Sequence, residues 1–171
     1  MPRHIQRHSF KVAGLAGFLG RLLVREGREF DLKLIYAGSL LHDLGKARSI
    51  QSGEDHGQLG AAFLEEDGFF VVADIVREHA TMDSQRALGT ISESLLVNYA
   101  DKRVRHDEVV TLDDRFLDLV NRYARAPHHR ISIWGKLSLY RQIEERIFQN
   151  LPIGPESREI MTVECLPLFN P

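Results

Sequence analysis

The chain has 171 residues, of which 43% are hydrophobic and 27% are charged, and its net charge is −2 at pH 7. This length suits one domain with a sizeable core, and the near-neutral charge predicts no broad attraction to nucleic acid or anionic membranes. Cys165 is the only cysteine, which excludes a disulfide within the chain, and no apolar run resembles a membrane span or signal peptide, so we expect a cytoplasmic protein.

The first quarter of the chain predicts two helices and a loop. Apolar residues recur at helical spacing over residues 12–23, and Gly27 ends this segment. Asp31 can cap a second helix, which we expect Gly45 to end in the left-handed conformation. The polar residues 46–55 predict a loop.

The remaining patterns are also helical. Further helices are predicted over residues 56–67 and 69–79, from Thr90 or Ser92 to about Arg105, from Asp113 through Leu117 to Val120, and over residues 133–147 after a loop at 126–129. The strand signal is too weak to build a sheet. We therefore expect an all-α, single-domain helical bundle over residues 1–150. Residues 151–171 would form a tail, with at most one further helical turn, that packs on the domain or on a neighbouring chain.

The most informative local feature is the pair His42-Asp43 within Leu40–Lys46. An imidazole beside a carboxylate at a helix end can hold a divalent cation at the wall of a core. Four further candidate ligands stand near the ends of other predicted helices: His8, His56, His79 and Asp101. Because this set offers nitrogen and carboxylate ligands and no thiolate, it favours Mn, Fe, Ni, Mg or Zn in a functional site over a structural zinc site.

Helical geometry indicates which of these residues can meet. His8 lies on the inward stripe of the first helix, so antiparallel packing of the first two helices would place it beside His42-Asp43. Taken singly, each of the other candidates is better explained as a core histidine, a helix-end residue or a surface carboxylate. Taken together, the six favour convergence at one end of the bundle. The other histidines are expected at the surface: His4, His106, His128 and His129.

These residues resemble a known family. The set of His8, His42-Asp43 and Asp101 resembles a known signature. This is the H…HD…D signature of the HD-domain metal-dependent phosphohydrolase superfamily. The resemblance covers residues 8–105 and is strongest at Leu40–Lys46 and Asn98–Lys102. It implies the helical HD fold and a metal-dependent hydrolase of phosphate ester or anhydride bonds.

The additional histidines are similar to positions in two-metal members of the family. Those members include bacterial hydrolases of symmetric dinucleoside tetraphosphates and the HD-GYP cyclic dinucleotide phosphodiesterases. The resemblance implies a first metal held by His8, His42, Asp43 and Asp101. Asp43 would bridge to a second metal held by His56 and His79. The Gly-Tyr-Pro element is absent and Glu78 replaces a histidine of that branch, which disfavours a cyclic dinucleotide. A one-metal site, with His56 and His79 contacting substrate, is the alternative.

The expected chemistry uses one or two divalent ions, with Fe or Mn favoured and Mg, Ni, Co or Zn as alternatives. A hydroxide activated by metal at Asp43 would attack phosphorus. Lys46 would neutralise the phosphate oxygens as a catalytic and substrate-binding residue, and Arg48 is a second candidate for substrate binding. The expected partner is a small phosphorylated molecule of the nucleotide kind, with no nucleic acid and no membrane, and an oligomer is compatible with the sequence.

Two other classes of function remain open from the sequence. A diiron oxygenase of the same fold would use the same ligands and would depend on dioxygen. A non-catalytic nucleotide-sensing module would have no need of the complete ligand set. Substrate selection is expected in the segments 46–55, 81–89 and 106–111.

Overall fold

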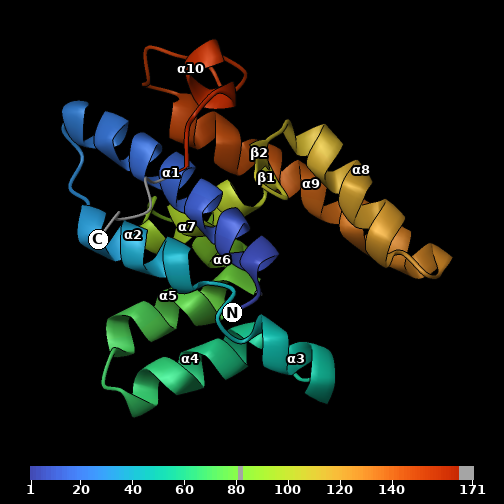
Figure 1. The fold of residues 1–171 in the computed structure, drawn as a ribbon. Helices are drawn as coiled ribbons and strands as arrows, with labels where there is room; N and C mark the ends of the chain where they lie inside the picture. The colour runs from blue at the N-terminus through green and yellow to red at the C-terminus, as the bar shows by residue number, and fades with distance from the viewer. Residues whose placement is uncertain (81–82, 166–171) are drawn as a thin grey trace.

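The structure is a computed structural model that describes residues 1–80 and 83–165. Its elements follow the chain in the order α1 (Arg3–Arg25), α2 (Leu32–Leu41), α3 (Lys46–Ser52), α4 (His56–Glu66), α5 (Phe70–Ala80), α6 (Ser84–Ala87), α7 (Glu93–Asp101), β1 (Val104–Arg105), β2 (Glu108–Val109), α8 (Leu112–Tyr123), α9 (Pro127–Phe148) and α10 (Arg158–Met161). The two strands form one antiparallel hairpin. The predicted all-α, single-domain bundle is confirmed (Figure 1).

The helical hairpin at the N-terminus forms as its end signals predict. Gly27 takes the left-handed φ of +83° just beyond Glu26, the C-cap of α1. Asp31 caps α2, because its carboxylate accepts hydrogen bonds from the backbone N–H groups of Lys33 and Leu34 at 2.9 and 3.1 Å. Helices α1 and α2 pack side by side, and the start of α1 therefore lies near the end of α2 (Figure 1).

The segment after His42-Asp43 differs from the sequence prediction. Residues 46–52 form α3 where a loop was expected, and Gly45 is the N-cap of this helix with φ −75°, not a left-handed C-cap. Gly45 is required for a different reason. A Cβ atom there would clash with the carbonyl oxygen of His56 and would lie 2.6 Å from the backbone N of Gly60. The missing side chain therefore lets α4 approach the end of α2.

Two further boundaries, and the burial of one residue, differ from the expected ones. Helix α7 ends at Asp101 rather than near Arg105, because the chain turns into β1. The expected loop at 126–129 is mostly helical, since Pro127 takes the first position of α9, where its missing N–H has no helical partner. Leu117, expected inside, is exposed.

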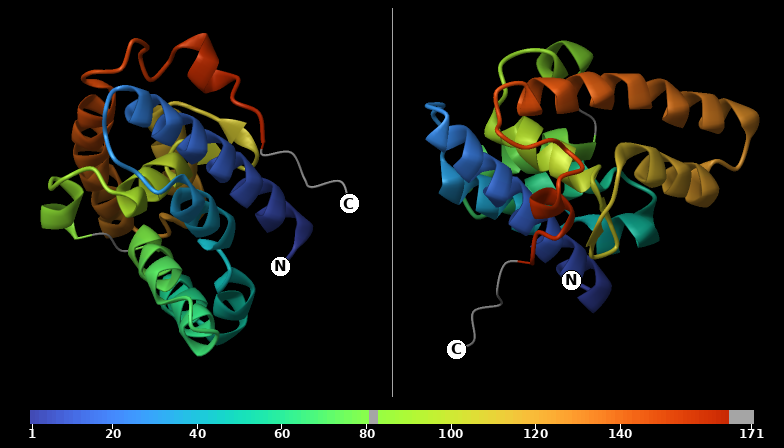
Figure 2. Two further views of the ribbon diagram at one scale, coloured as in Figure 1. Left: turned by 90° about the vertical axis from the view of Figure 1, so that its left-hand side faces the viewer. Right: turned by 90° about the horizontal axis from the view of Figure 1, so that it is seen from above.

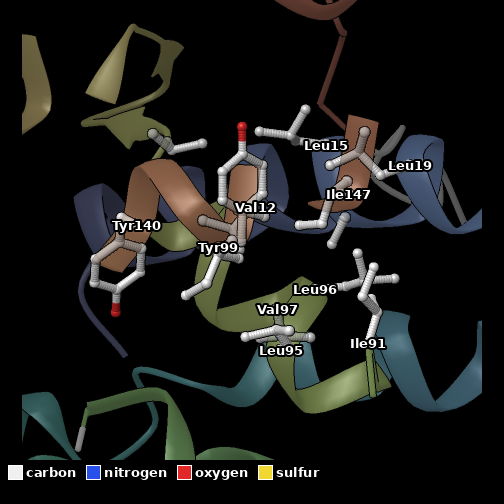
Figure 3. Packing of buried hydrophobic residues seen from close by; sticks show 14 of the residues in the cluster. Val12, Leu15, Leu19, Ile91, Leu95, Leu96, Val97, Tyr99, Tyr140 and Ile147 are labelled. Atoms are coloured by element: carbon white, nitrogen blue, oxygen red, sulfur yellow. The ribbon is translucent and has the colours of Figure 1, made fainter. Parts of the chain in front are cut away.

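The main core lies between α1, α7 and α9 (Figure 3). It includes Val12, Leu15 and Leu19 of α1, Leu95, Leu96 and Tyr99 of α7, and Tyr140 and Ile147 of α9. Every residue of α7 from Ser94 to Asp101 is buried. A smaller cluster of Ala61, Leu64, Ala73 and Val76 joins α4 to α5. Helix α7 thus gives Asp101 a rigid support within the protein interior.

The described part of the C-terminal segment runs to Cys165, and residues 166–171 lie outside the described residues. Ile160 of α10 and Val163 are buried against the main core. The carbonyl of Val163 accepts a hydrogen bond of 2.8 Å from Lys11 Nζ on α1. The single turn expected beyond residue 150 corresponds to α10.

Helices α8 and α9 form a second hairpin, whose connected end projects from the rest of the bundle (Figures 1 and 2). In the part of the chain that the structure describes, none of the helices combines the length and apolar character that a membrane crossing requires.

Candidate metal centre

The structure brings the six candidate ligands together at one end of the bundle. They come from five elements: His8 from α1, His42 and Asp43 from the end of α2, His56 from the start of α4, His79 from α5 and Asp101 from the end of α7. Two groups of three could each hold a metal ion, with all ligand atoms of a group within 4.8 Å of one another. The first group is His8, His42 and Asp43, and the second is Asp43, His56 and His79.

Asp43 belongs to both groups, and its two oxygens face different histidines. Its Oδ2 lies 3.8 Å from His42 Nε2. Its Oδ1 lies 3.6 Å from His56 Nε2 and 3.7 Å from His79 Nε2. These separations are longer than hydrogen bonds, so the nitrogen and oxygen atoms surround a space between them rather than bonding directly. This arrangement suits a carboxylate shared by two cations.

Asp101 lies beside two histidines of the first group. Its Oδ1 lies 3.0 Å from His8 Nε2 and 3.8 Å from His42 Nε2. Its Oδ2 accepts a hydrogen bond of 2.5 Å from Lys102 Nζ. One oxygen is therefore held by the neighbouring lysine, and the other is directed towards the histidines.

Three of the histidines have their ring orientation fixed by backbone carbonyls. The Nδ1 atoms of His8, His42 and His79 lie 2.8, 2.7 and 2.5 Å from the carbonyl oxygens of His106, Ser39 and Val76. A carbonyl only accepts, so each Nδ1 must carry the proton, which leaves the lone pair on Nε2. This is the usual arrangement of metal-binding histidines, whose second nitrogen donates to a carbonyl or carboxylate.

His8 Nε2 faces Asp101, but the Nε2 atoms of the other histidines have less ordinary surroundings. His42 Nε2 is fully buried and has no hydrogen-bond partner among the described residues. His56 Nε2 and His79 Nε2 lie 3.1 Å apart. Because His79 Nε2 holds a lone pair, this approach needs a proton or a cation between the two rings. Buried polar atoms without partners are rare, and a metal ion satisfies both observations.

The charges at this site match the needs of a divalent cation. Burial lowers the pKa of His42 to about 4 and also lowers the pKa of His56, so both imidazoles are neutral near pH 7. Burial opposes ionisation of Asp43, but the neighbouring His42, His79 and Lys46 hold its pKa below the usual value. The pKa of Asp101 is also low, because Lys102 and His8 outweigh burial. Neutral imidazoles and ionised carboxylates are the forms that bind metal.

A cleft of about 460 Å³ opens beside the candidate ligands His8 and Asp43. Its lining comes from α1, the turn between α2 and α3, α3, the β1–β2 turn and α8: His4, Ile5, Arg7, His8, Asp43, Lys46, Ile50, His106, Asp107, Arg115, Arg122 and Tyr123. Lys46 Nζ lies 3.2 Å from both oxygens of Asp43. Arg48 is outside this lining, and its guanidinium lies 5.5 Å from the ring centre of Phe63.

Sequence reasoning missed the contribution of α8, from which Arg115 and Arg122 line the cleft. The turn between the strands belongs to the segment 106–111 in which substrate selection was expected. His106 of this turn was itself expected at the surface, and it also lines the cleft. His106 has a left-handed φ of 57°, which turns its carbonyl towards His8. The seven-residue spacing of the two arginines places them on one face of a helix, but that signal is equally typical of a solvated face.

Comparison with known proteins agrees with this geometry. The family model described as HD domain matches residues 5–126, a range that contains all six candidate ligands. The uncharacterized protein MJ0778 of Methanocaldococcus jannaschii is 29% identical over 124 residues, which cover 65% of this chain and 72% of that protein. No solved structure gives a significant match.

Proposed function

This chain belongs to the HD domain family, a superfamily of metal-dependent phosphohydrolases, and we propose that it hydrolyses a phosphate ester or anhydride bond with a two-metal centre. The observation that carries the proposal is the shared position of Asp43. One of its oxygens faces His42 and the other faces His56 and His79. A one-metal site would not need the second pair of histidines at this distance from the carboxylate.

We assign His8, His42, Asp43 and Asp101 to the first ion, and Asp43, His56 and His79 to the second. The two carboxylates balance part of the charge of two divalent ions, which leaves a site that attracts a phosphate dianion. Imidazole and carboxylate ligands suit iron or manganese, and Mg, Ni, Co or Zn are the alternative ions.

Divalent ions held by these residues would supply Lewis acidity for water activation and for the phosphoryl oxygens. The protein supplies the remaining functions. The carbonyls of Ser39, Val76 and His106 orient the ligand rings before substrate binds. Lys46, which is 38% exposed on its side chain, can move from Asp43 to a phosphate oxygen and stabilise its charge in the transition state. Because Arg48 packs over Phe63 outside the cleft, we give the phosphate contact to Lys46.

The substrate that we propose is nucleotide-like. The finer assignment, a dinucleoside tetraphosphate, rests on the likeness of His56 and His79 to the two-metal branch of the family. The cleft of about 460 Å³ is within the size range of sites that bind small organic molecules.

The proposal is tested by metal content and turnover together. Protein purified without chelator or nickel resin should contain about two equivalents of iron or manganese. It should release phosphate from a panel of nucleotides and dinucleoside polyphosphates without dioxygen. Turnover only in the presence of dioxygen would favour the oxygenase, and protein that takes up no metal after reconstitution would contradict both enzymes.

A further inference from the structure

We propose that Arg115 and Arg122 of α8 form a second anion subsite beside the metal centre. This subsite selects substrates in which another phosphate is linked to the one that is cleaved. The inference rests on the proposed function, which makes the metal centre the place where the reacting phosphate binds.

Arg115 lies at the inner end of the cleft, next to the metal ligands. Its side chain is 13% exposed, and its Nη2 lies 3.9 Å from Asp101 Oδ1. Its Nη1 donates to Asp118 Oδ2 at 3.0 Å. Within the residues that the structure describes, its buried Nε has no hydrogen-bond partner. A guanidinium carries five N–H donors, so this buried arginine has donors to spare for an anion in the cleft.

Arg122 stands two helical turns farther along the same face, about 10 Å from Arg115 along the helix axis. Its Nε donates to Asp118 Oδ1 at 2.8 Å. Asp118 thus lies between two guanidinium groups, with one oxygen on each. One carboxylate orients both arginines and leaves the three side chains with a net positive charge.

The subsite is connected to the metal centre through His106. Arg122 Nη2 donates to His106 Nε2 at 2.6 Å, and the backbone carbonyl of His106 accepts from His8 Nδ1 at 2.8 Å. The left-handed backbone of His106 allows its ring and its carbonyl to face these two partners. A fixed hydrogen-bond path therefore sets the position of Arg122 relative to a candidate ligand of the first ion.

The charge of the cleft explains why a single phosphate does not engage all of its cationic groups. Its lining contains four cationic side chains, Arg7, Lys46, Arg115 and Arg122, against the carboxylates Asp43 and Asp107. The carboxylate of Asp118, which bonds both arginines of α8, balances one further charge. Divalent ions at the centre would add further positive charge. A single phosphate held at the centre engages the metals and Lys46, and it leaves the outer part of α8 without an anion. A linked second phosphate can accept from Arg122, since guanidinium groups match phosphate oxygens in geometry as well as charge.

The test uses the metal-loaded full chain with p-nitrophenyl phosphate as substrate and metal in excess. Two non-hydrolysable inhibitors are compared, methylphosphonate with one phosphonate group and methylenediphosphonate with two. We expect the diphosphonate to inhibit at least about tenfold more tightly, since each well-formed charged contact contributes more than 1.4 kcal/mol. In Arg122→Gln, this preference should fall below about threefold. The control Arg125→Gln changes an exposed arginine outside the cleft lining and should keep the full preference.

Equal inhibition of the unchanged protein by the two phosphonates would overturn the subsite, as would an unaltered preference in Arg122→Gln. Asp118→Asn provides a second variant, which should reduce the preference by releasing both arginines. If p-nitrophenyl phosphate and the nucleotide panel are not hydrolysed at all, the proposed function fails. The subsite is then judged by calorimetric titration of the two phosphonates into the same folded variants, with the same preference expected.

Discussion

Asp43 is the side chain on which both candidate metal groups depend. We expect Asp43→Ala to remove both ions, because it deletes the one carboxylate that faces His42 as well as His56 and His79. His56→Ala should remove only the second ion. Elemental analysis of the purified variants measures this difference, and circular dichroism checks that each remains helical. His129→Ala, an exposed histidine on α9, is the matched control with two ions retained. Full metal content in Asp43→Ala would contradict the assignment.

Lys46 makes contact with Asp43 but belongs to neither metal group. We expect Lys46→Ala to keep its metal and to lower kcat by about 10- to 1000-fold, since the charge it provides is needed most in the transition state. Lys46→Arg should recover part of the rate. Steady-state kinetics with metal analysis of the same samples separates this result from loss of the ions. Unchanged kcat would remove Lys46 from the mechanism.

The buried His42 also predicts how the metal-free protein responds to acid. Its pKa is about 4 in the folded state and 6.5 in the reference state. Between these values the unfolded chain binds more protons, so the free energy of unfolding falls as the pH decreases from 6.5 towards 4. Over this whole interval His42 lowers the free energy of unfolding by roughly 3 kcal/mol. His56, whose pKa is also lowered, acts in the same direction.

Urea unfolding in the presence of a chelator at several pH values measures this dependence. The low pKa values of Asp43 and Asp101 add a further loss only below about pH 4, which separates their contribution from that of His42. A free energy of unfolding that stays constant between pH 6.5 and 4.5 would contradict the predicted state of His42.

At the scale of elements, the approach of α4 to the end of α2 depends on Gly45. We expect Gly45→Ala to push the start of α4 away, because its Cβ would meet the backbone of His56 and Gly60. The variant should lose about 1–3 kcal/mol of stability and bind the second ion more weakly. Gly135→Ala, on an open face of α9, is the control and should gain up to about 1 kcal/mol. Thermal unfolding and metal titration provide the measurements.

These elements show what the sequence could predict. Helical periodicity and end signals anticipated the α1–α2 hairpin and hence the approach of His8 to His42-Asp43. The role of Gly45 was misjudged, because a glycine after a helix is usually a C-cap and the approach of α4 is a tertiary contact. Arg115 and Arg122 were missed for a similar reason: charged residues on a helix are usually solvated, and only the packed structure shows a cleft beside them.

For the whole molecule, the buried Arg103 joins α7 to the C-terminal segment. Its guanidinium donates to the carbonyl oxygens of Val110 and Pro155, to Tyr99 Oη and to Glu144 Oε2. We expect Arg103→Leu to cost about 3–5 kcal/mol, because Glu144 would lose its buried partner. Arg105→Leu, which breaks a more exposed pair with Glu108, should cost less than about 1 kcal/mol. Urea unfolding of both variants tests the contrast, and equal losses would contradict it.

The candidate ligands are also synthesised at different times, because His8 and Asp101 are 93 positions apart in the chain. A ribosome that adds 5–20 residues per second needs roughly 5 to 20 seconds to cover this interval. Throughout it the emerging chain already carries His8 and, for more than half of it, His42-Asp43, but not the carboxylate of Asp101. Such a partial set has no fixed geometry and holds any divalent ion only weakly. Selection between metals therefore falls to the finished protein, after α7 and the turn at His106 have joined α1, and it depends on the ions then available.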